Sequence, residues 1–470
     1  MTERFDLVVI GAGAAGLTAA GGAALFGLKV ALVEAGDMGG ECLNTGCVPS
    51  KALIAAAARA STGRSGARLG VALGEPVVDF AAVRAHVDQA IARIAPEDSQ
   101  ERFEAMGVAV IRARARFLDR STILAGNRRL KAGRFVIATG SRPTLPPIEG
   151  LAEAAPLTNE TLFGLETLPS HLIVLGGGPV GIEMAQAFRR LGAAVTLIGA
   201  APWLGREDRE AVALVVEQLG MEGVVLLATQ AIRVERDHEV RVHCANGEVA
   251  AGSHLLVATG RTANIETLDL AAAGVETGAD GIVVDAGRRT SNRRILAIGD
   301  CRAGPRFTHV AGYEGALVAA RVALGVRGKV DWRALPRVTY TDPELAQIGP
   351  TQAEAEARYG RIEVTREAFA HNHRAVTEGD TRGFLKLVRH RGRVVGVTIV
   401  GAHAGELLLP WAQVITGRSS SFALGSAVIA YPTRSEIAKA AAFATWQPAL
   451  FGRWPKRWAR LRARARSWRV

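Results

Sequence analysis

The feature that most constrains the fold of this chain is a pattern that occurs twice. An apolar run over 5–10, and another over 172–175, each lead into glycines spaced as G-x-G-x-x-G, followed by a stretch that predicts a helix. A second apolar strand follows each helix, at 29–33 and 194–198. The motif glycines are Gly11, Gly13, Gly16, Gly176, Gly178 and Gly181. We therefore expect two βαβ units of the doubly wound, Rossmann-like type.

These glycines have defined physical roles in binding a dinucleotide. The first permits a tight turn, the second lets the backbone approach a pyrophosphate, and the third lets the helix pack closely on the strand. The helix N-terminus then presents unpaired N–H groups to the anion. One such motif is weak evidence, but two in the same strand-to-helix context make dinucleotide binding the favoured interpretation.

The two units differ where the second strand ends. In the first unit this place holds Glu34, whose carboxylate can accept both ribose hydroxyls of FAD or NAD. In the second unit it holds Gly199, so no acid binds a 2′-hydroxyl or repels a 2′-phosphate. Use of NADPH is therefore favoured, and NADH stays open. Arg206 is a candidate phosphate partner, and it can equally be a surface residue before the helix that begins near 207.

Further strands that end at glycine, and a change of pattern near 335, indicate how the chain is organised. Buried strands lead to Thr139-Gly140 and to Gly260, and a third leads to Gly299-Asp300. From about 335 onward the glycine pattern stops, and alternating strands mix with helical stretches. This change predicts a separate α+β domain at the C-terminal side of the two nucleotide units.

Composition and charge exclude several classes of protein. The 470 residues carry a formal net charge of +12, but eight of the 57 basic residues and none of the acidic ones lie in 451–470. The remainder is nearly neutral, so we expect no nucleic-acid binding. The apolar runs are far shorter than the ~20 residues of a membrane-spanning helix. Four cysteines, and a strand-like run at Phe5 that leaves no room for a signal peptide, predict a cytoplasmic protein.

A pair of cysteines, Cys42 and Cys47, follows the first nucleotide unit in the sequence G-G-E-C-L-N-T-G-C-V-P-S-K, which ends at Lys51. Two cysteines cannot complete a tetrahedral zinc site, and no other Cys or His is near in sequence, so zinc is the weaker alternative. The four intervening residues include a glycine and let the chain bend enough for a disulfide. Lys51, one turn into the following helix, can lower a thiolate pKa or touch a flavin. The pair is therefore interpreted as redox active.

With these motifs the chain resembles the class I pyridine nucleotide-disulfide oxidoreductases, a family that includes glutathione reductase, dihydrolipoamide dehydrogenase and mercuric reductase. The resemblance covers about residues 5–448 and implies a homodimer that passes hydride from a nicotinamide nucleotide through FAD to the Cys42–Cys47 disulfide. The fold class is then α/β, with two Rossmann-like domains and a C-terminal α+β dimerisation domain. The expected segments are FAD binding at 1–150 and 276–334, NAD(P) binding at 151–275, the interface at 335–449, and a basic tail at 450–470. The expected cofactor-binding residues are Gly11, Gly13, Gly16, Glu34, Lys51, Ala115, Thr139, Gly140, Asp300 and His309 for FAD, and Gly176, Gly178, Gly181, Gly260 and Arg206 for the nicotinamide nucleotide.

The resemblance also implies roles around the disulfide. Cys47 would be the charge-transfer thiol beside the flavin, and Cys42 would be the interchange thiol that attacks the substrate. Glu183 matches the acid that pairs with the flavin-side lysine, here Lys51. The alternative for Glu183 is a solvated helix residue.

The chain departs from the disulfide-reducing members at the residue before Pro432-Thr433. Those members place a His there and a Glu four residues after the Pro; this chain has Tyr431 and Glu436. A phenol titrates near pH ~10 and an imidazole near ~6.5, so protonation of a departing thiolate should be slow. A soft metal ion bound by thiolates needs no such proton, and Tyr at this place is similar to mercuric reductase-like members.

The favoured interpretation is therefore a mercuric reductase-like reductase of a soft metal ion or a thiol compound. No cysteine follows Cys301, so the C-terminal pair with which mercuric reductase captures metal is missing. A dihydrolipoamide dehydrogenase-like enzyme is the alternative. Cys301 and Cys244 are expected to be packed without chemistry, and His309 to be structural. His371 and His373 have a spacing that could serve a metal, although a solvated pair is favoured, and no metal site is assigned.

The basic tail has the pattern of an amphipathic helix after Pro455. At 100° per residue its apolar residues fall within an arc of roughly 80°, while the arginines lie largely elsewhere. The stripe consists of Trp454, Trp458, Leu461, Ala465 and Trp468. Such a helix suits an anionic membrane surface or a partner protein, which would make the chain a docked electron donor. The same stripe could instead pack on the protein's own dimer.

Overall fold

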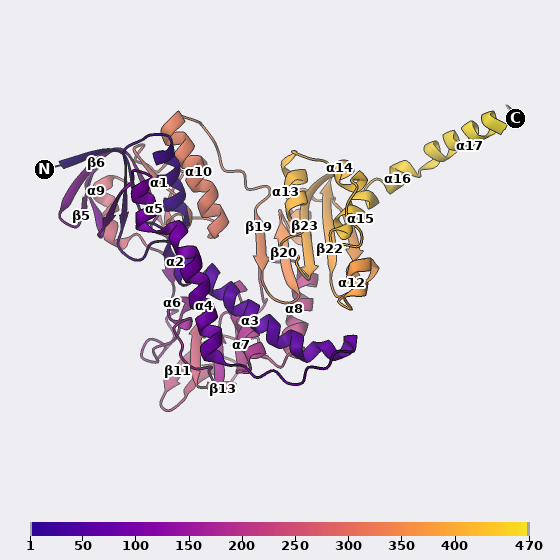
Figure 1. The fold of residues 1–470 in the computed structure, drawn as a ribbon, viewed down its shortest axis with the longest axis horizontal. Coiled ribbons are helices and arrows are strands. Elements are labelled where there is room, and N and C mark those ends of the chain that lie inside the picture. The colour runs from indigo at the N-terminus through magenta and orange to yellow at the C-terminus, as the bar shows by residue number, and fades with distance from the viewer. Residues whose placement is uncertain (1, 468–470) are drawn as a thin grey trace. The chain divides into compact units, whose positions relative to one another are not determined.

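The computed structural model describes residues 2–467, and its chain divides into two compact units. Each unit is described separately (Figure 1). The first unit consists of the residues up to 62, 75–200 and 225–330. The second unit consists of residues 63–74, 201–224 and those from 331 onward.

The N-terminal sheet of the first unit has the doubly wound arrangement. Its parallel strands lie in the order β3, β2, β1, β6, β18, and β5 and β4 continue antiparallel from β6. The strands are β1 (Thr2–Ile10), β2 (Val30–Glu34), β3 (Ala109–Arg112), β4 (Ala115–Asp119), β5 (Thr122–Ala125), β6 (Arg128–Ile137) and β18 (Ile295–Ala297). The second strand thus begins one residue later than the sequence predicts.

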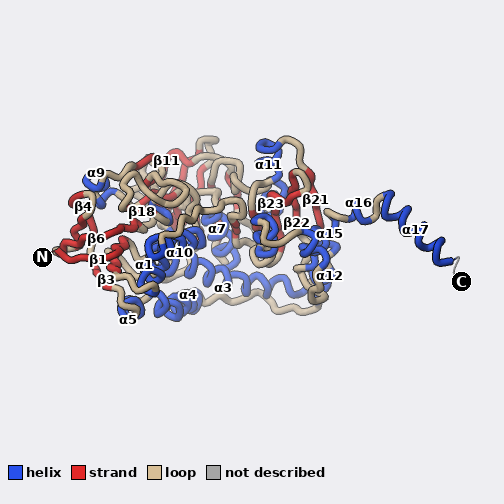
Figure 2. Tube along the Cα trace, turned by 90° about the horizontal axis from the view of Figure 1, so that it is seen from above, coloured by secondary structure: helices blue, strands red, loops and turns tan. Residues whose placement is uncertain are grey.

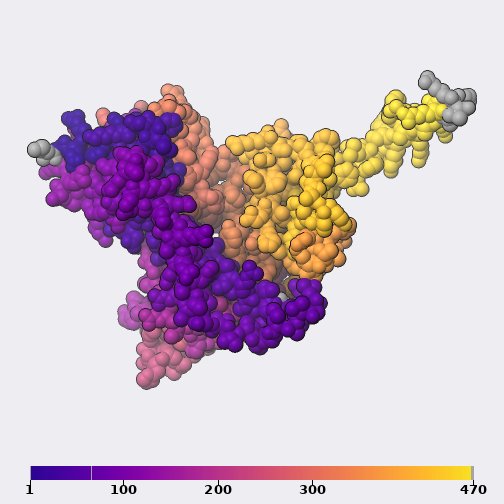
Figure 3. Space-filling view, in the orientation of Figure 1, coloured from indigo at the N-terminus to yellow at the C-terminus, as the bar shows by residue number. Residues whose placement is uncertain are grey.

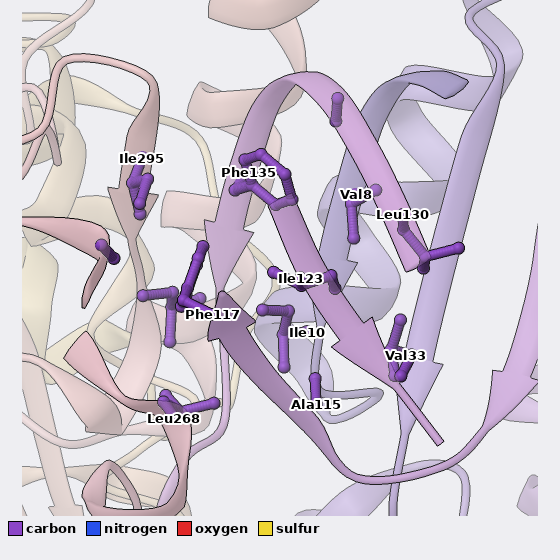
Figure 4. Packing of buried hydrophobic residues seen from close by; sticks show 14 of the residues in the cluster. Val8, Ile10, Val33, Ala115, Phe117, Ile123, Leu130, Phe135, Leu268 and Ile295 are labelled. Atoms are coloured by element: carbon purple, nitrogen blue, oxygen red, sulfur yellow. The ribbon is translucent and has the colours of Figure 1, made fainter. Parts of the chain in front are cut away.

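Continuous apolar runs form these strands because the sheet is buried on both faces. Along β1, Val8 and Ile10 pack into one core cluster while Leu7 and Val9 pack into another. Phe117 from β4 meets a second phenylalanine from β6 edge-on, with ring centroids 5.5 Å apart. Figure 4 shows the cluster that contains Val8, Ile10 and Phe117, together with residues of the neighbouring strands.

Helix α1 (Ala14–Leu25) connects β1 to β2 and lies beside α10 (Thr308–Leu324), as Figure 1 and Figure 2 show. Glycines permit this close approach: a Cβ on Gly315 would lie 2.6 Å from the Ala15 carbonyl oxygen. The remaining helices and 3₁₀ turns are α2 (Gly40–Asn44), α3 (Cys47–Ser65), α4 (Phe80–Ile94), η2 (Ala95–Asp98), α5 (Gln100–Ala105), α6 (Asn159–Leu162), η3 (Glu266–Leu268), α9 (Leu270–Ala273) and η4 (Gly299–Cys301). Short strand pairs are β7 (Ser141–Pro143) with β15 (Arg261–Ala263), and β16 (Thr277–Gly278) with β17 (Gly281–Ile282).

The second dinucleotide unit repeats this arrangement with a smaller sheet. Its parallel strands lie in the order β10, β9, β8, β14, and α7 connects β8 to β9. An antiparallel sheet of β11, β12 and β13 accompanies it. The elements are β8 (His171–Leu175), α7 (Pro179–Leu191), β9 (Ala194–Ile198), β10 (Val225–Leu227), β11 (Ala231–Arg236), β12 (Val240–Cys244), β13 (Val249–Gly252) and β14 (His254–Val257).

The second compact unit is built on an antiparallel sheet in the order β19, β20, β23, β22, β21. Buried Trp411 lies in its hydrophobic core. The strands are β19 (Pro336–Thr339), β20 (Glu344–Ile348), β21 (Glu363–Ala368), β22 (Phe384–His390) and β23 (Arg393–Gly401). The helices and turns are η1 (Gly66–Leu69), α8 (Arg209–Met221), α11 (Gln352–Tyr359), η5 (Phe369–His371), α12 (His373–Thr377), α13 (Leu409–Thr416), α14 (Ser421–Ser426), α15 (Glu436–Ala444), α16 (Gln447–Leu450) and α17 (Arg453–Ser467).

The α/β fold class with a C-terminal α+β part is confirmed, but the compact units do not divide at the expected boundaries. Residues 201–224, expected in the NAD(P)-binding segment, pack with the C-terminal sheet. Lys386 on β22 donates to both carboxylate oxygens of Asp208 at 2.9 and 3.0 Å, and both side chains are buried. This ion pair, with Arg337 on Glu207 at 2.9 Å, joins α8 to that sheet.

Candidate active site

The turn between β1 and α1 forms a cradle in which two glycines are required sterically. Gly11 has φ +107°, and a Cβ there would lie 2.3 Å from the Ala138 carbonyl oxygen. A Cβ on Gly16 would lie 1.8 Å from the carbonyl oxygen of Gly11. Gly13 is the N-cap of α1, so the first N–H groups of that helix follow directly.

A cavity of about 870 Å³ opens beside this turn. Glu34 lies at its edge and accepts hydrogen bonds from Ala12 N and, at 2.6 Å, from Gly36 N. The predicted residues that line the cavity are Gly11, Gly13, Glu34, Cys42, Ala115, Thr139, Gly140 and Asp300. A volume of this size, with a helix N-terminus and a carboxylate at its wall, fits a dinucleotide such as FAD.

A polar network surrounds Asp300, and most of its members were not predicted from the sequence. Ser141 Oγ donates to Asp300 Oδ2 at 3.0 Å, and Arg261 Nε donates to that same hydroxyl at 2.8 Å. Arg261 also forms an ion pair with Glu41, whose pKa is raised because the carboxyl group is buried. Asn159 donates to Glu41 at 2.8 Å. Among these unpredicted residues, only Glu41 stands in a recognisable motif, because it directly precedes Cys42.

Another unpredicted residue, Glu314 on α10, supports the turn that carries Asp300. Its carboxylate accepts a hydrogen bond from Gly299 N at 2.8 Å. The same carboxylate pairs with Arg302 at 2.7 Å, and both side chains have no exposed surface. No motif marks Glu314, because its partners come from elements that are separate in sequence.

The two cysteines are brought together by the turn between α2 and α3. Cys42 lies on α2, Cys47 begins α3, and both are free thiols that hydrogen bond to each other. Gly46 allows the tight turn, because a Cβ there would lie 2.9 Å from the Glu41 carbonyl oxygen. Thr308 at the start of α10, which the sequence did not indicate, places its hydroxyl 3.3 Å from Cys47 Sγ.

This hydrogen bond makes the two sulfur atoms chemically unequal. The thiol of Cys42 donates to the thiolate of Cys47, which lowers the pKa of Cys47 to about 6, with further contributions from Thr308 and Lys51. The same bond, together with burial, raises the pKa of Cys42. At neutral pH the reduced pair therefore holds its negative charge on Cys47 and its proton on Cys42.

We expect this inequality to be measurable as the pH dependence of alkylation at each cysteine of the reduced protein, read by mass spectrometry. Because the thiolate reacts, alkylation of Cys47 should rise with pH through a midpoint of about 6. In Cys42→Ala the donor thiol is lost, so the midpoint should move toward the ~8.5 of a free cysteine. An unchanged midpoint in this variant would contradict the assigned cause.

The structure also brings Lys51 and Glu183 together. Lys51 Nζ donates to Glu183 Oε2 at 2.8 Å, and the Glu183 side chain is 5% exposed, so it is not a solvated helix residue. This pair connects α3 of the disulfide segment to α7 of the second dinucleotide unit. It leaves the lysine charge close enough to contribute to the lowered pKa of Cys47.

The second glycine turn has the same geometry as the first. Gly176 has φ +127°, and a Cβ there would lie 2.3 Å from the Ala258 carbonyl oxygen. A Cβ on Gly181 would lie 2.0 Å from Gly176 O, and Gly178 is the N-cap of α7. Gly260 is exposed just beyond the end of β14. Arg206 is exposed in the other compact unit, so its part in nucleotide binding stays a prediction.

The remaining predicted site residues have the following environments. Tyr431 is 69% exposed, and its hydroxyl lies 3.1 Å from His373 Nδ1. Glu436 begins α15 and accepts a hydrogen bond from Thr433 N at 3.3 Å. His309 is exposed and stacks on the ring of Phe307.

Cys301 and Cys244 are both buried, and burial raises the pKa of Cys301 to about 12. Within residues 2–467, no three His, Cys, Asp or Glu side chains are grouped so that they could hold a metal ion. None of the helices in that range combines the length and apolar character needed to cross a bilayer.

Comparison with known proteins identifies the family. Residues 5–315 match the family model for pyridine nucleotide-disulphide oxidoreductases, and residues 335–442 match the dimerisation domain of the same family. This chain belongs to the pyridine nucleotide-disulphide oxidoreductase family. The family uses FAD and a nicotinamide nucleotide, and the match to its dimerisation domain agrees with the expected homodimer.

Relatives within this family carry different names. A mercuric reductase from Streptomyces lividans is 36% identical, over 93% of this chain and 95% of the relative. A dihydrolipoyl dehydrogenase from Geobacillus stearothermophilus is 32% identical, over 93% and 95%. Among solved structures, the Cu(II) complex of the HOCl-induced flavoprotein disulfide reductase RclA from Escherichia coli has a TM-score of 0.83 and 26% identity, covering 92% of this chain and 98% of that one.

Proposed function

We propose that this chain reduces a soft metal ion, presented as a thiol complex, at the Cys42–Cys47 pair with electrons from NADPH or NADH. The observation that carries the proposal is Tyr431, which stands where the disulfide-reducing members have a histidine. A mercuric reductase among the relatives supports the same class of acceptor. Thiolates bind soft metal ions in preference to hard ones, and two of them suffice to hold such an ion in transit.

The residues of the cradle would hold the FAD. Glu34 and Asp300 line the cavity, and in this proposal Glu34 would bind the ribose, the N-terminus of α1 would face the pyrophosphate, and Asp300 would bind the ribityl chain. Bound there, FAD would supply the two-electron chemistry that links a nicotinamide nucleotide to the cysteine pair. Lys51 keeps a positive charge beside this path, and Glu183 keeps Lys51 in place.

The inequality of the two thiols defines their roles in metal capture. Cys42 lines the cavity and carries the proton of the reduced pair. For Cys42 to bind an incoming ion, its S–H bond must break while the bond from the ion to one of its small thiol ligands breaks. The departing thiolate then takes up one proton, and Cys47 supplies the second thiolate without further proton loss.

Dihydrolipoamide dehydrogenase-like activity is the alternative, supported by the relative of that name. The two functions differ in the acceptor that the enzyme reduces fastest. We expect the purified protein to consume NADPH anaerobically with thiol-complexed Hg(II), and at least about tenfold more slowly with lipoamide or glutathione disulfide, because Tyr431 is a poor acid. Cys42→Ala is the control that measures direct reactions of the flavin, which are subtracted as background. Faster turnover with a disulfide would contradict the proposal.

The helix α17 carries a further proposal, that the tail docks the protein on an anionic membrane surface. All side chains from 453 to 466 are exposed, including Trp454 at 79% and Trp458 at 65%. The space-filling view shows this helix standing clear of the other helices of its unit (Figure 3). Exposed tryptophans beside arginines suit the boundary between acyl chains and acidic headgroups. Trp468, the last member of the predicted stripe, lies outside the described residues.

Vesicle sedimentation tests this tail. The full chain should pellet with vesicles of phosphatidylserine and phosphatidylcholine, less with phosphatidylcholine alone, and less again at high salt, because headgroup attraction is screened. A chain ending at residue 450 should stay in the supernatant. Trp454→Ser with Trp458→Ser is the matched control that keeps the charge and removes the stripe. Equal pelleting of the full and shortened chains would overturn the proposal.

A further inference from the structure

Tyr431 has a partner that neither the sequence nor the family match assigns. His373 begins α12, and its Nδ1 lies 3.1 Å from the Tyr431 hydroxyl. The two rings meet edge-on, with centroids 5.8 Å apart and planes at 89°. The sequence gives no sign of this contact, because the two residues are 58 positions apart.

Surrounding contacts hold the segment of Tyr431 against α12. Asn372 caps α12 by accepting from Ala375 N at 3.0 Å, and its amide donates to the Thr433 carbonyl at 3.1 Å. The guanidinium of Arg434 is 9% exposed and binds carboxylates of the segment that follows α12. The backbone segments that carry His373 and Tyr431 are therefore held together by contacts other than the one between the two rings.

The charged groups around this pair mostly neutralise one another. Arg434 pairs with Glu378 at 2.7 Å and with Asp380 at 2.9 Å, and Arg374 pairs with Glu378 at 2.5 Å. Glu436 accepts from the backbone of its own segment. The polar partner of Tyr431 is therefore an imidazole, and the carboxylate of Glu436 is engaged elsewhere.

We propose that His373 is a positioning residue that relays protons through the Tyr431 hydroxyl to the thiolate leaving the metal ion, and that this Tyr–His pair is a poorer acid than the single histidine of the disulfide-reducing members. The proposal rests on the proposed function, which places Tyr431 at the acceptor. A phenol alone titrates far above neutral pH, whereas an imidazole normally changes its protonation near pH ~6.5. Hydrogen bonded in series, the two groups can move a proton that neither the phenol nor a distant imidazole would move alone.

The proton balance of metal capture defines the step. Cys42 loses its S–H proton as its sulfur binds the ion, and the bond between the ion and a small thiolate breaks. The Tyr431 hydroxyl gives its proton to the departing thiolate and regains one from the imidazolium of His373. The proton released from Cys42 passes to solvent, and His373, whose side chain is exposed, takes up a proton from solvent. No net proton is consumed, and a free thiol leaves.

Three variants distinguish a relay from a structural contact. His373→Ala removes the partner, His373→Asn keeps a hydrogen-bonding group near the place of Nδ1 but cannot titrate, and Tyr431→Phe removes the hydroxyl. We expect each to lower kcat/KM with thiol-complexed Hg(II) roughly 10- to 100-fold near neutral pH, and to abolish the limb of the pH profile that titrates as an imidazole. Wild-type rates in His373→Ala, or a wild-type pH profile in His373→Asn, would overturn the relay.

The matched control is His371→Ala, an exposed histidine two positions away, which should keep the wild-type profile. Direct reduction of ferricyanide by NADPH, which bypasses the cysteine pair, should be equal in all variants and shows that the flavin site is intact. A loss of ferricyanide reduction in the His373 variants would mean that the residue is structural, and would count against the proposal.

A measurement without turnover separates this inference from the proposed function. NMR titration of labelled histidines in the FAD-bound protein should show the midpoint of His373 moving in Tyr431→Phe, and that of His371 staying in place. If the wild-type enzyme reduces no thiol-complexed metal, the proposed function fails. The shift of the His373 midpoint in Tyr431→Phe still shows whether His373 and Tyr431 are coupled. An unmoved His373 midpoint would overturn the inference.

Discussion

Replacing Cys42 by Ala is expected to lower kcat/KM for every thiol-linked acceptor by about 10³-fold or more, because the thiol that we propose to bind the acceptor first is lost. The rate at which NADPH reduces the bound flavin should stay near that of the wild type. The hydrogen bonds of the Lys51–Glu183 pair and of Ser141 with Asp300 do not use the Cys42 thiol. Steady-state turnover checks the expected loss of kcat/KM, and stopped-flow measurement of flavin reduction checks that this rate is unchanged.

Cys47→Ala should be as damaging to turnover, but for a different reason. The thiolate of Cys47 carries the charge of the reduced pair, so its loss leaves Cys42 without the partner that it needs to re-form a disulfide or to hold an ion. Cys244→Ala, at a buried cysteine of β12, is the control and should keep full activity. Full turnover in Cys42→Ala would mean that the acceptor takes electrons directly from the flavin.

Replacing Glu314 by Ala is expected to destabilise the FAD-binding part by about 3–5 kcal/mol. The substitution leaves the guanidinium of Arg302, with no exposed surface, and that of Arg288, with 6%, without this carboxylate. It also removes the acceptor of Gly299 N, directly before Asp300. We therefore expect the thermal midpoint of flavin release to fall by about 10 °C, together with weaker retention of FAD.

Fluorescence of released flavin during heating measures this change, and gel filtration measures retention. Glu314→Gln should lie between the wild type and Glu314→Ala, since the amide oxygen still accepts one hydrogen bond but the charge is lost. Glu276→Gln, at an exposed glutamate of the same unit, should change stability by less than about 0.5 kcal/mol. Equal stability of Glu314→Ala and wild type would contradict the assigned role.

Part of the candidate site can be recognised from short stretches of sequence. The glycine turns, Glu34 at the end of β2, and the spacing of Cys42 and Cys47 each depend on neighbours within one βαβ unit or one turn. The Lys51–Glu183 contact was expected from the resemblance alone, since 132 positions separate the two residues. Glu183 is buried, which its helix pattern by itself does not show.

Other parts of the site have no local signal. Thr308 reaches Cys47 across 261 positions, and Arg261 reaches Ser141 across 120. Glu314 looks like one more helix glutamate until its two buried arginines are in place. The grouping of residues 201–224 with the C-terminal sheet has no local signal either, because the buried Lys386–Asp208 pair joins segments that are far apart in the sequence.

The sequence by itself determined that this chain has two dinucleotide units, a cysteine pair and a tyrosine before Pro432. Glycine spacing and strand-to-helix periodicity act over a few residues, so they can be recognised without a fold. The tertiary structure decided which thiol holds the charge, what supports the turn of Asp300, and that Tyr431 meets His373. Those properties depend on hydrogen bonds and burial between side chains distant in sequence, which exist only after the elements have packed.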